Sequence, residues 1–382
     1  MDTPKRILLV QLYSNGDCLY ATAVARQIKQ DFPGCHLTWN IAGFCKNIIA
    51  QNPFVDEVLV TEEIPKNDII AFRKLKKKVF REKKEGKWAE VFVTHNMDDN
   101  QALYNGTIRG MIFGAYPNPI TVPVQPVLVL LEEEKQKVKL FAAKNELSRF
   151  RNIILWEYAP QSGQSVLTFD FVMKVAERII HLPDTCVILS SANSFSSTGN
   201  IIDASSLSVR ENAALTYYCT LLIGCSSGIT WLSTSSAAKQ LPMLQLLDPQ
   251  AYFRNAPSID FERYGISTNE LIELTAFDED KICTVVKAIT EEGIIRVKEK
   301  YNEALPVQFN TTRKVVYNLL CYLQLKAIAR HYHITTAIYG RNSLFIKEFI
   351  LAFIKFPFKL LANKWRKRVS RKDAKAQNKF QI

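Results

Sequence analysis

The 382-residue sequence lacks the cysteine and histidine spacings that identify metal sites and disulfide-rich domains. Its eight cysteines form no C-x-x-C pair, and His36, His181, His331 and His333 show no spacing typical of metal ligands. Most of the cysteines lie inside apolar stretches, which is typical of reduced core thiols in a cytosolic protein. We therefore expect no disulfide framework and no structural metal.

The sequence also lacks a signal peptide, since residues 1–6 run directly into a predicted strand. Its most apolar stretch, residues 344–361, contains four charged residues, namely Lys347, Glu348, Lys355 and Lys359. A transmembrane helix needs about 20 predominantly apolar residues, so this stretch carries too much charge for a span. The sequence thus predicts a cytoplasmic protein that does not cross the membrane.

A net positive charge is absent from most of the chain and is concentrated at its end. From Arg313 onward there are 16 lysine and arginine residues and two acidic ones, whereas the preceding 312 residues carry 33 basic and 35 acidic residues. The globular part is therefore near neutral, which argues against a protein that grips nucleic acid over its whole surface. Because the aromatic residues of the tail belong to an apolar helix face, we expect no nucleic-acid partner.

Two segments, one in each half of the chain, carry most of the functional signal. Residues 7–17 and residues 221–228 each combine an apolar strand, a turn of small residues and the start of a helix. Such a turn directs backbone N–H groups and the positive end of a helix dipole at whatever lies above it. The pair predicts two nucleotide-binding-type domains that face each other across a cleft.

Strand and helix patterns alternate along both halves, which favours parallel, doubly wound sheets. Apolar runs predict strands at residues 7–12, 36–41, 57–61, 90–94, 152–156, 185–189, 221–223 and 243–246. Helices are expected between them, among them residues 18–31, 69–84, 132–146, 169–180, 209–217, 229–238 and one long helix at 278–302. We predict an α/β fold with Rossmann-like domains at residues 1–145 and 146–310, followed by a helical basic tail at 311–382.

The tail contains an amphipathic helix pattern over residues 343–368 and a basic end over residues 365–372. Polar positions 348, 355, 359, 363 and 366 fall along one stripe of this helix. Lysines beside a large apolar face suit a helix that lies in the membrane interface, with its charges towards anionic headgroups. We expect residues 343–372 to bind an anionic membrane surface, with packing of the apolar face on the globular domains as the alternative.

The ordered motifs resemble the heptosyltransferase-like glycosyltransferases of family 9, over residues 7–247. The motifs are Ser14-Asn-Gly-Asp17, Ala21-Thr22-Ala23, Phe32-Pro33, Asn52-Pro-Phe-Val-Asp-Glu-Val58, Ser206-Leu-Ser-Val-Arg-Glu-Asn-Ala-Ala-Leu215 and Leu222-Ile-Gly-Cys-Ser-Ser-Gly228. The resemblance implies GT-B architecture, in which the first Rossmann-like domain lies on the acceptor side and the second binds a nucleotide sugar.

The resemblance also implies a reaction, the inverting transfer of a sugar from a nucleotide-sugar donor, such as ADP-heptose, to a lipid-linked bacterial glycan. A typical acceptor is the lipopolysaccharide core at the inner face of the cell membrane. Neither a cofactor nor a metal ion is implied. We therefore expect a peripheral membrane enzyme that carries out hexosyl or heptosyl transfer.

Individual residues receive roles from the same resemblance. Asp17 matches the catalytic base, and its alternative role is to cap the helix that it starts. The donor phosphates would lie at Ser226, Ser227 and Gly228, whose alternative is a tight turn without a ligand. Four residues are candidates for the acceptor side: Asn15, Gly16, His95 and Asn96. For His95 and Asn96, a polar surface loop is an equally good interpretation.

The sequence departs from the family pattern at the donor site. The family has a lysine that faces the donor diphosphate, but residues 157–165 contain none, so neutral donors would substitute: Gln161, Ser162, Gln164 and Ser165. Ser226 replaces an acidic residue, and Trp231 replaces a histidine and either stacks on a nucleotide base or packs in the core. These departures leave two alternatives open, a catalytically inactive GT-B binding or scaffold protein and a GT-B sugar-nucleotide epimerase or hydrolase.

Overall fold

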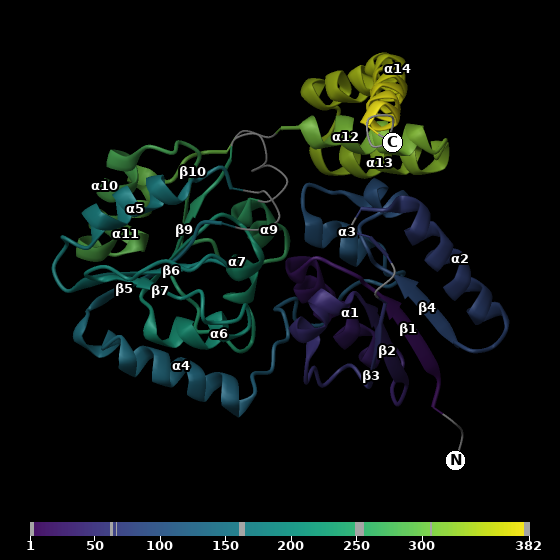
Figure 1. Cartoon of the computed structure of the whole chain (residues 1–382). Coiled ribbons are helices and arrows are strands. Elements are labelled where there is room, and N and C mark those ends of the chain that lie inside the picture. Colours follow the sequence, from purple (N-terminus) through teal and green to yellow (C-terminus); the bar gives the residue numbers. More distant parts are fainter. Residues whose placement is uncertain are drawn as a thin grey trace. The chain divides into compact units, whose positions relative to one another are not determined.

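The computed structural model describes residues 4–61, 64–65, 67–159, 165–248, 256–305 and 308–377, with side chains of the last helix described to residue 360. The chain divides into two compact units (Figure 1). One comprises Met1–Met97 and Gly106–Leu305, and the other comprises Asp98–Asn105 and Pro306–Ile382. The first unit contains both sheets.

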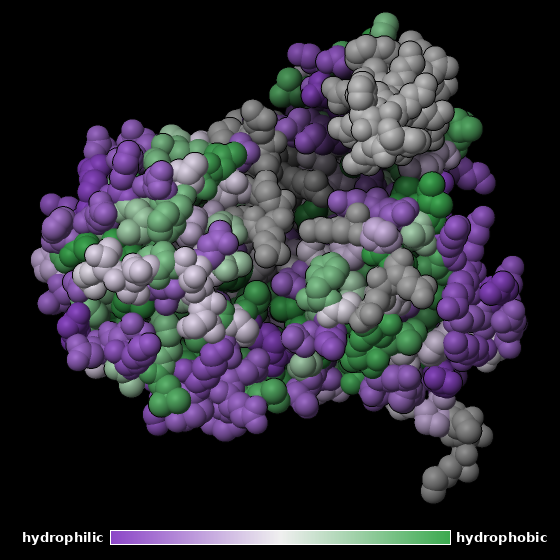
Figure 2. All heavy atoms as spheres, in the orientation of Figure 1, coloured by the Kyte–Doolittle hydropathy of each residue, from purple (hydrophilic) through white to green (hydrophobic). Residues whose placement is uncertain are grey.

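The first sheet is built from the N-terminal strands. The parallel strands β1 (Arg6–Val10), β2 (His36–Ile41), β3 (Glu57–Val60) and β4 (Glu90–Val93) pair in the order β3-β2-β1-β4. Helix α1 (Asn15–Asp31) follows β1, and helix α2 (Ile69–Lys84) precedes β4. Helix α2 buries Phe72 and Val79, and Figure 2 shows hydrophilic residues along the edge of the molecule that this basic helix forms.

The second sheet has six parallel strands in the order β10-β9-β8-β5-β6-β7. Their bounds are β5 (Asn152–Glu157), β6 (Thr185–Ser190), β7 (Ile201–Asp203), β8 (Leu221–Gly224), β9 (Met243–Leu246) and β10 (Leu271–Leu274). The accompanying helices are α4 (Glu132–Lys144), α5 (Phe169–Ile179), α6 (Glu211–Leu215), α7 (Gly228–Leu232), α9 (Pro257–Arg263), α10 (Glu279–Glu292) and α11 (Ile294–Tyr301). The prediction of parallel, doubly wound sheets is confirmed.

Two predicted helices differ from the structure. The prediction of a single helix over residues 278–302 is wrong. The structure has two helices there, α10 and α11, and Gly293 separates them with a φ of +87°. Such a conformation is readily available only to glycine, so the chain turns there instead of continuing the helix. The helix predicted over residues 229–238 is shorter in the structure. Helix α7 ends at Leu232, and a run of serine and threonine follows it.

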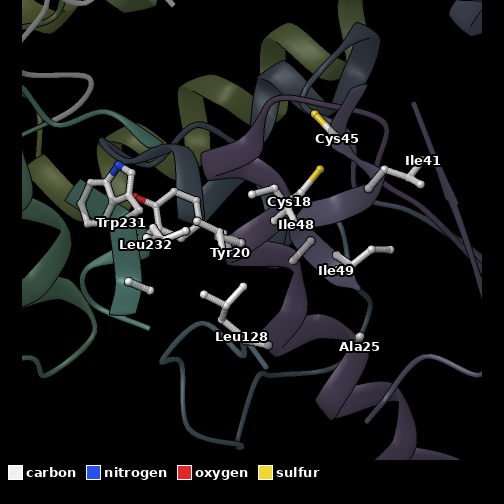
Figure 3. Close-up of a cluster of buried hydrophobic side chains, with 14 of the residues drawn as sticks. Cys18, Tyr20, Ala25, Ile41, Cys45, Ile48, Ile49, Leu128, Trp231 and Leu232 are labelled. Atoms are coloured by element: carbon white, nitrogen blue, oxygen red, sulfur yellow. The ribbon is translucent and has the colours of Figure 1, made fainter. Parts of the chain in front are cut away.

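The two halves of the first unit share a hydrophobic core. Figure 3 shows Tyr20 of α1 beside Trp231 of α7, with ring centroids 5.0 Å apart. The Arg109 guanidinium, on helix α3 (Ile108–Gly114), lies 2.9 Å from the Asp260 carboxylate of α9, and both side chains are fully buried. Helix α1 and these contacts therefore join the N-terminal sheet to the C-terminal one.

The second unit is helical. It contains α12 (Asn310–Cys321), α13 (Leu325–Tyr339), α14 (Ser343–Gln377) and a short 3-10 helix, η2 (Asp98–Leu103). Phe345 of α14 is fully buried, and Phe349 and Phe356 pack partly buried on the same core, which includes Val316 of α12. Among the described residues, no helix has both the length and the apolar character needed to cross a membrane.

Candidate functional site

Each sheet has one point at which the order of strand addition reverses. This point lies between β1 and β4 in the first sheet and between β5 and β8 in the second. Open α/β sheets bind ligands outside the carboxyl ends of their strands at such points. Residues 15–17 follow β1, residues 95–96 follow β4, Glu157 ends β5, and residues 226–228 follow β8. The predicted site residues therefore occupy both reversal points.

The two predicted turns meet in space. A Cβ atom added to Gly16 would lie 3.4 Å from Trp231 Cδ1 and 3.9 Å from the Cα of Gly228, and one added to Gly228 would lie 3.7 Å from the Cβ of Asn15. Helices α1 and α7 thus begin side by side. The structure brings together the start of the first domain's helix and the glycine turn of the second domain.

A cavity of about 460 Å³ opens between these turns. Its lining residues come from both halves: Ser14, Asn15, Gly16, Phe44, Glu157, Ala159, Ser190, Ser191, Ala192, Ser205, Leu207, Ser208, Val209, Asn212, Gly228 and Ile229. The described lining is rich in hydroxyl groups and contains no lysine, arginine or histidine. Glu157 is its single acidic side chain.

Asp17 lies in the first turn of α1 and is half-buried. Asn96 donates a hydrogen bond from Nδ2 to Asp17 Oδ2 over 2.8 Å. The carboxylate of Asp17 also lies at the positive end of the α1 helix dipole. The amide of Asn96 therefore fixes the orientation of the Asp17 side chain.

His95, predicted on the acceptor side, is buried within the first domain. Its ring centroid lies 4.5 Å from that of Tyr13 and 5.2 Å from that of Phe72, and both contacts are edge-on. Burial lowers the pKa of His95 to about 3, so the imidazole is neutral at pH 7. The interpretation of residues 95–96 as a polar surface loop is therefore wrong for His95.

The turn after β8 is tightly built. The backbone N–H of Ser226 donates to Gln245 Oε1 over 2.8 Å, and Ser227 Oγ accepts from the N–H of Ile229 over 3.3 Å as the N-cap of α7. A Cβ atom at Gly224 would lie 2.6 Å from the Thr230 hydroxyl, so only glycine fits there. Both serines are buried, and of residues 226–228 it is Gly228 that lines the cavity.

Trp231 is buried among aromatic rings. It contacts Tyr20 on one side and Phe261 on another, with centroids 5.0 Å and 6.0 Å away, and the Arg109 guanidinium lies 5.9 Å from its ring. The structure places this side chain in the core beneath the two turns and not in the lining of the cavity. The structure thus shows that Trp231 packs in the core. Its stacking on a nucleotide base stays a prediction.

Three of the four residues predicted as neutral hydrogen-bond donors lie outside the described residues, namely Gln161, Ser162 and Gln164. Ser165 is half-buried, and its hydroxyl accepts a hydrogen bond from the N–H of Leu167 over 3.1 Å. Over the described parts of the chain, no group of three histidine, cysteine, aspartate or glutamate side chains could hold a metal ion.

Glu157 is the site residue that the sequence analysis missed. It is 5% exposed, ends β5 at the reversal point of the second sheet, and lines the cavity. Burial raises the pKa of Glu157 to about 7, and hydrogen bonds from the Ser227 hydroxyl and the N–H groups of Ile229 and Thr230 oppose this rise. A polar signal existed in the sequence, since this acidic residue directly follows four apolar strand residues.

Comparison with known proteins identifies the fold. No family model matches the sequence, and no curated protein matches it either. Among solved structures, the chain is similar to the glycosyltransferase family 9 protein from Veillonella parvula, with 15% identity, 85% of this chain and 99% of that chain covered, and a TM-score of 0.52. It is also similar to the E. coli ADP-heptose lps heptosyltransferase II, with 14% identity, 77% and 99% coverage, and a TM-score of 0.49.

This similarity extends over nearly the whole length of the Veillonella parvula structure. At such identities it shows the fold, which is a GT-B-like pair of parallel α/β sheets with additional C-terminal helices. The predicted GT-B architecture is therefore confirmed.

Proposed function

We propose that the protein is an inverting glycosyltransferase that transfers a sugar, heptose or a related one, from a nucleotide sugar to a lipid-linked bacterial glycan. The observation that carries this proposal is the convergence of both helix-start turns on one cavity, with Asp17 beside it in the first turn of α1. The family 9 motifs lie at these same turns. Sugar transfer uses a donor site in one domain and a base in the other, and this arrangement supports the assignment of these two roles.

The chemistry assigned to Asp17 is general base catalysis. Inversion requires the acceptor hydroxyl to attack the anomeric carbon from the side opposite the leaving diphosphate, while a base removes the hydroxyl proton. Asp17 supplies an acceptor oxygen for this proton, and Asn96 fixes its orientation through the 2.8 Å hydrogen bond. The donor would occupy the 460 Å³ cavity, whose hydroxyl groups suit a sugar nucleotide.

Substitution of the base tests this proposal. Asp17→Asn removes the proton acceptor at nearly constant volume, so transfer is expected to fall by about 10²- to 10⁴-fold while donor affinity and folding are kept. Asp170→Asn is the matched control, because Asp170 lies in the first turn of α5 and is exposed. Product formation from a nucleotide sugar and a lipid-linked acceptor extract is measured for both variants. Full activity of the Asp17 variant would reject the assigned base.

Membrane association of the second unit completes the proposal. On α14, Leu344, Ile350, Phe353, Ile354 and Phe358 are exposed apolar residues. In the structure, two residues of the predicted polar stripe face α12. Glu348 pairs with Arg313 of α12 over 3.2 Å, and Lys359 lies 4.8 Å from the ring of Tyr317, also on α12. The face of α14 away from α12 is thus apolar with flanking lysines, which suits the interface of an anionic membrane.

A second candidate function follows from the charge of the cavity. Its described lining contains a buried carboxyl group and no basic side chain, and this is the observation that supports a catalytically inactive binding protein as the second candidate. Product analysis separates the candidates: an inactive protein converts no nucleotide sugar, an epimerase or hydrolase converts it without an acceptor, and a transferase needs the acceptor.

A further inference from the structure

Glu157 places an ionisable acid where an anionic donor would bind. It lines the cavity together with Gly228 and Asn15, at the reversal point of the second sheet. Its Oε2 atom is buried and has no hydrogen-bond partner in the described part of the chain. A buried carboxylate with an unpartnered oxygen is costly, and protonation is the usual way to remove that cost.

Among the described residues, the groups around Glu157 provide no compensating positive charge. From α7 it faces the Ser227 hydroxyl and the N–H groups of Ile229 and Thr230, which are neutral donors. From the loop after β8 it faces the Cys225 thiol, whose pKa burial raises well above the usual range, so that it stays uncharged. From α1 and β6 the cavity presents residues 14–16 and 190–191, none of them ionisable. Glu157 is thus the group at this site whose charge can change near neutral pH.

An ADP-, GDP- or UDP-sugar carries two negative charges on its diphosphate, and a CMP-sugar carries one on its single phosphate. If this phosphate group binds in the cavity while Glu157 is ionised, anions approach each other with no cation among the described lining residues. Coulomb repulsion between neighbouring anions strongly opposes binding unless the charge of the donor or that of Glu157 is removed. The diphosphate of a nucleotide sugar does not take up a proton near pH 7, so the carboxyl group of Glu157 has to take one up from solvent.

We propose that Glu157 is a specificity-determining residue of the cavity, which takes up one proton when an anionic donor binds and excludes that donor when it is ionised. This inference rests on the proposed function, since it assumes a nucleotide sugar as the ligand. The cavity thus contains an ionisable acidic residue, Glu157, and its described lining lacks the lysine of the family 9 pattern. Donor binding is therefore linked to pH, and the protein holds nucleotide sugars more weakly in alkaline solution.

The test is calorimetric titration of the full chain with ADP-, GDP-, UDP- and CMP-sugars at pH 6, 7 and 8. For the wild type, the dissociation constant is expected to rise about fivefold between pH 7 and pH 8, as the linkage of one proton requires. Glu157→Gln should bind about equally at both values and more tightly than the wild type at pH 8. Glu177→Gln, an exposed change on α5, is the matched control and should follow the wild type.

A measurement on the unaltered protein covers the case in which the Glu157→Gln variant does not fold. Titration at pH 7.5 in two buffers of different ionisation enthalpy should show uptake of between half a proton and one proton per bound donor. A pH-independent affinity without proton uptake in the wild type would overturn the role of Glu157 while leaving donor binding intact. If no nucleotide sugar binds at pH 6, where Glu157 is neutral, the proposed function fails and this inference with it.

Discussion

Asp17 and Asn96 come from segments that are 79 residues apart, and the first sheet brings them within hydrogen-bonding distance. Each follows a strand on one side of the reversal point between β1 and β4. The sequence could name both residues because their motifs are local. It could not show that one orients the other, since this contact depends on the order of strands in the sheet.

The hydrogen bond from Asn96 should matter for the rate of transfer and not for donor binding. Asn96→Ala leaves Asp17 without its orienting partner, and hydrogen bonds to charged groups contribute about 1.5–3 kcal/mol, so kcat is expected to fall about 10- to 100-fold. The matched control is Asn118→Ala, because Asn118 donates to Asp31 at the other end of α1 over 2.9 Å. Steady-state kinetics with a varied donor provides the measurement. A raised donor KM with unchanged kcat would contradict the positioning role.

Glu157 also predicts how stability depends on pH. Its ordinary pKa is 4.5 and its folded value is about 7, so between these values the native state holds a proton that the unfolded state has lost. The free energy of unfolding therefore falls as the pH rises from about 4.5 to about 7. The difference between the two pKa values corresponds to about 3 kcal/mol.

Glu157→Gln removes this dependence because its side chain is neutral throughout. Relative to the wild type, the variant should gain up to about 3 kcal/mol of stability on going from pH 5 to pH 8, as measured by urea unfolding. Glu177→Gln, which removes an exposed charge, should show no such gain. If the difference between the Glu157→Gln variant and the wild type is equal at both pH values, the carboxyl group does not titrate in this range.

At the scale of elements, the long buried strands and amphipathic helices could be predicted. Strands β2 and β9 and helix α2 have the predicted bounds, because continuous apolar runs and helical spacing are local signals. Strands β7 and β10 are absent from the predicted set; β7 has only three residues, whereas β10 is as long as the correctly predicted β9. The division of α10 from α11 depends on a single glycine, and the buried position of His95 depends on the packing of Tyr13 and Phe72.

Helix α14 offers a matched pair of phenylalanines that separates folding from membrane binding. Phe345 is 0% exposed and packs in the core of the second unit, whereas Phe358 is 69% exposed. Phe345→Ala should destabilise this unit by about 3–5 kcal/mol. Phe358→Ala should change its stability by less than about 0.5 kcal/mol but weaken binding to anionic vesicles about tenfold, since a buried phenylalanine contributes about 1.5–3 kcal/mol.

Sedimentation with vesicles rich in anionic lipid measures this binding, and chemical unfolding measures the stability. Neutral vesicles serve as the lipid control, because the lysines beside the apolar face contribute only at a negatively charged surface. Equal sedimentation of the wild type and the Phe358 variant would show that the exposed face of α14 does not enter the membrane.

At the scale of the whole molecule, the Arg109–Asp260 pair links the N-terminal half to the C-terminal half of the first unit. Arg109 also lies over the rings of Tyr20 and Tyr264, with 4.6 Å and 5.2 Å from its Cζ atom to the centroids. Burial raises the pKa of Asp260 to about 6, and Arg109 opposes this rise. Arg109, together with Arg263, thus compensates the charge of a buried carboxylate.

Removal of this cation should destabilise the protein strongly. Arg109→Met keeps the apolar packing but removes the cation that is paired directly with the buried Asp260 carboxylate, which costs about 3–5 kcal/mol. Arg149→Met breaks the exposed pair between Arg149 and Glu146 and should cost less than about 1 kcal/mol. Urea unfolding at pH 7 compares the two variants with the wild type. A similar, small loss in both would mean that the buried pair contributes little to the joint between the halves.

A donor site in the cavity between the two turns should show itself as stabilisation of the protein by its donor. Thermal unfolding at pH 6 with ADP-, GDP-, UDP- and CMP-sugars measures this stabilisation. A ligand at about 100 times its dissociation constant adds about 2.7 kcal/mol, which raises the melting temperature by a few degrees. We expect such a shift with one nucleotide class, reduced by Gly228→Val, whose side chain would project towards Asn15. If none of these donors shifts the melting temperature, the cavity is not the donor site of a glycosyltransferase.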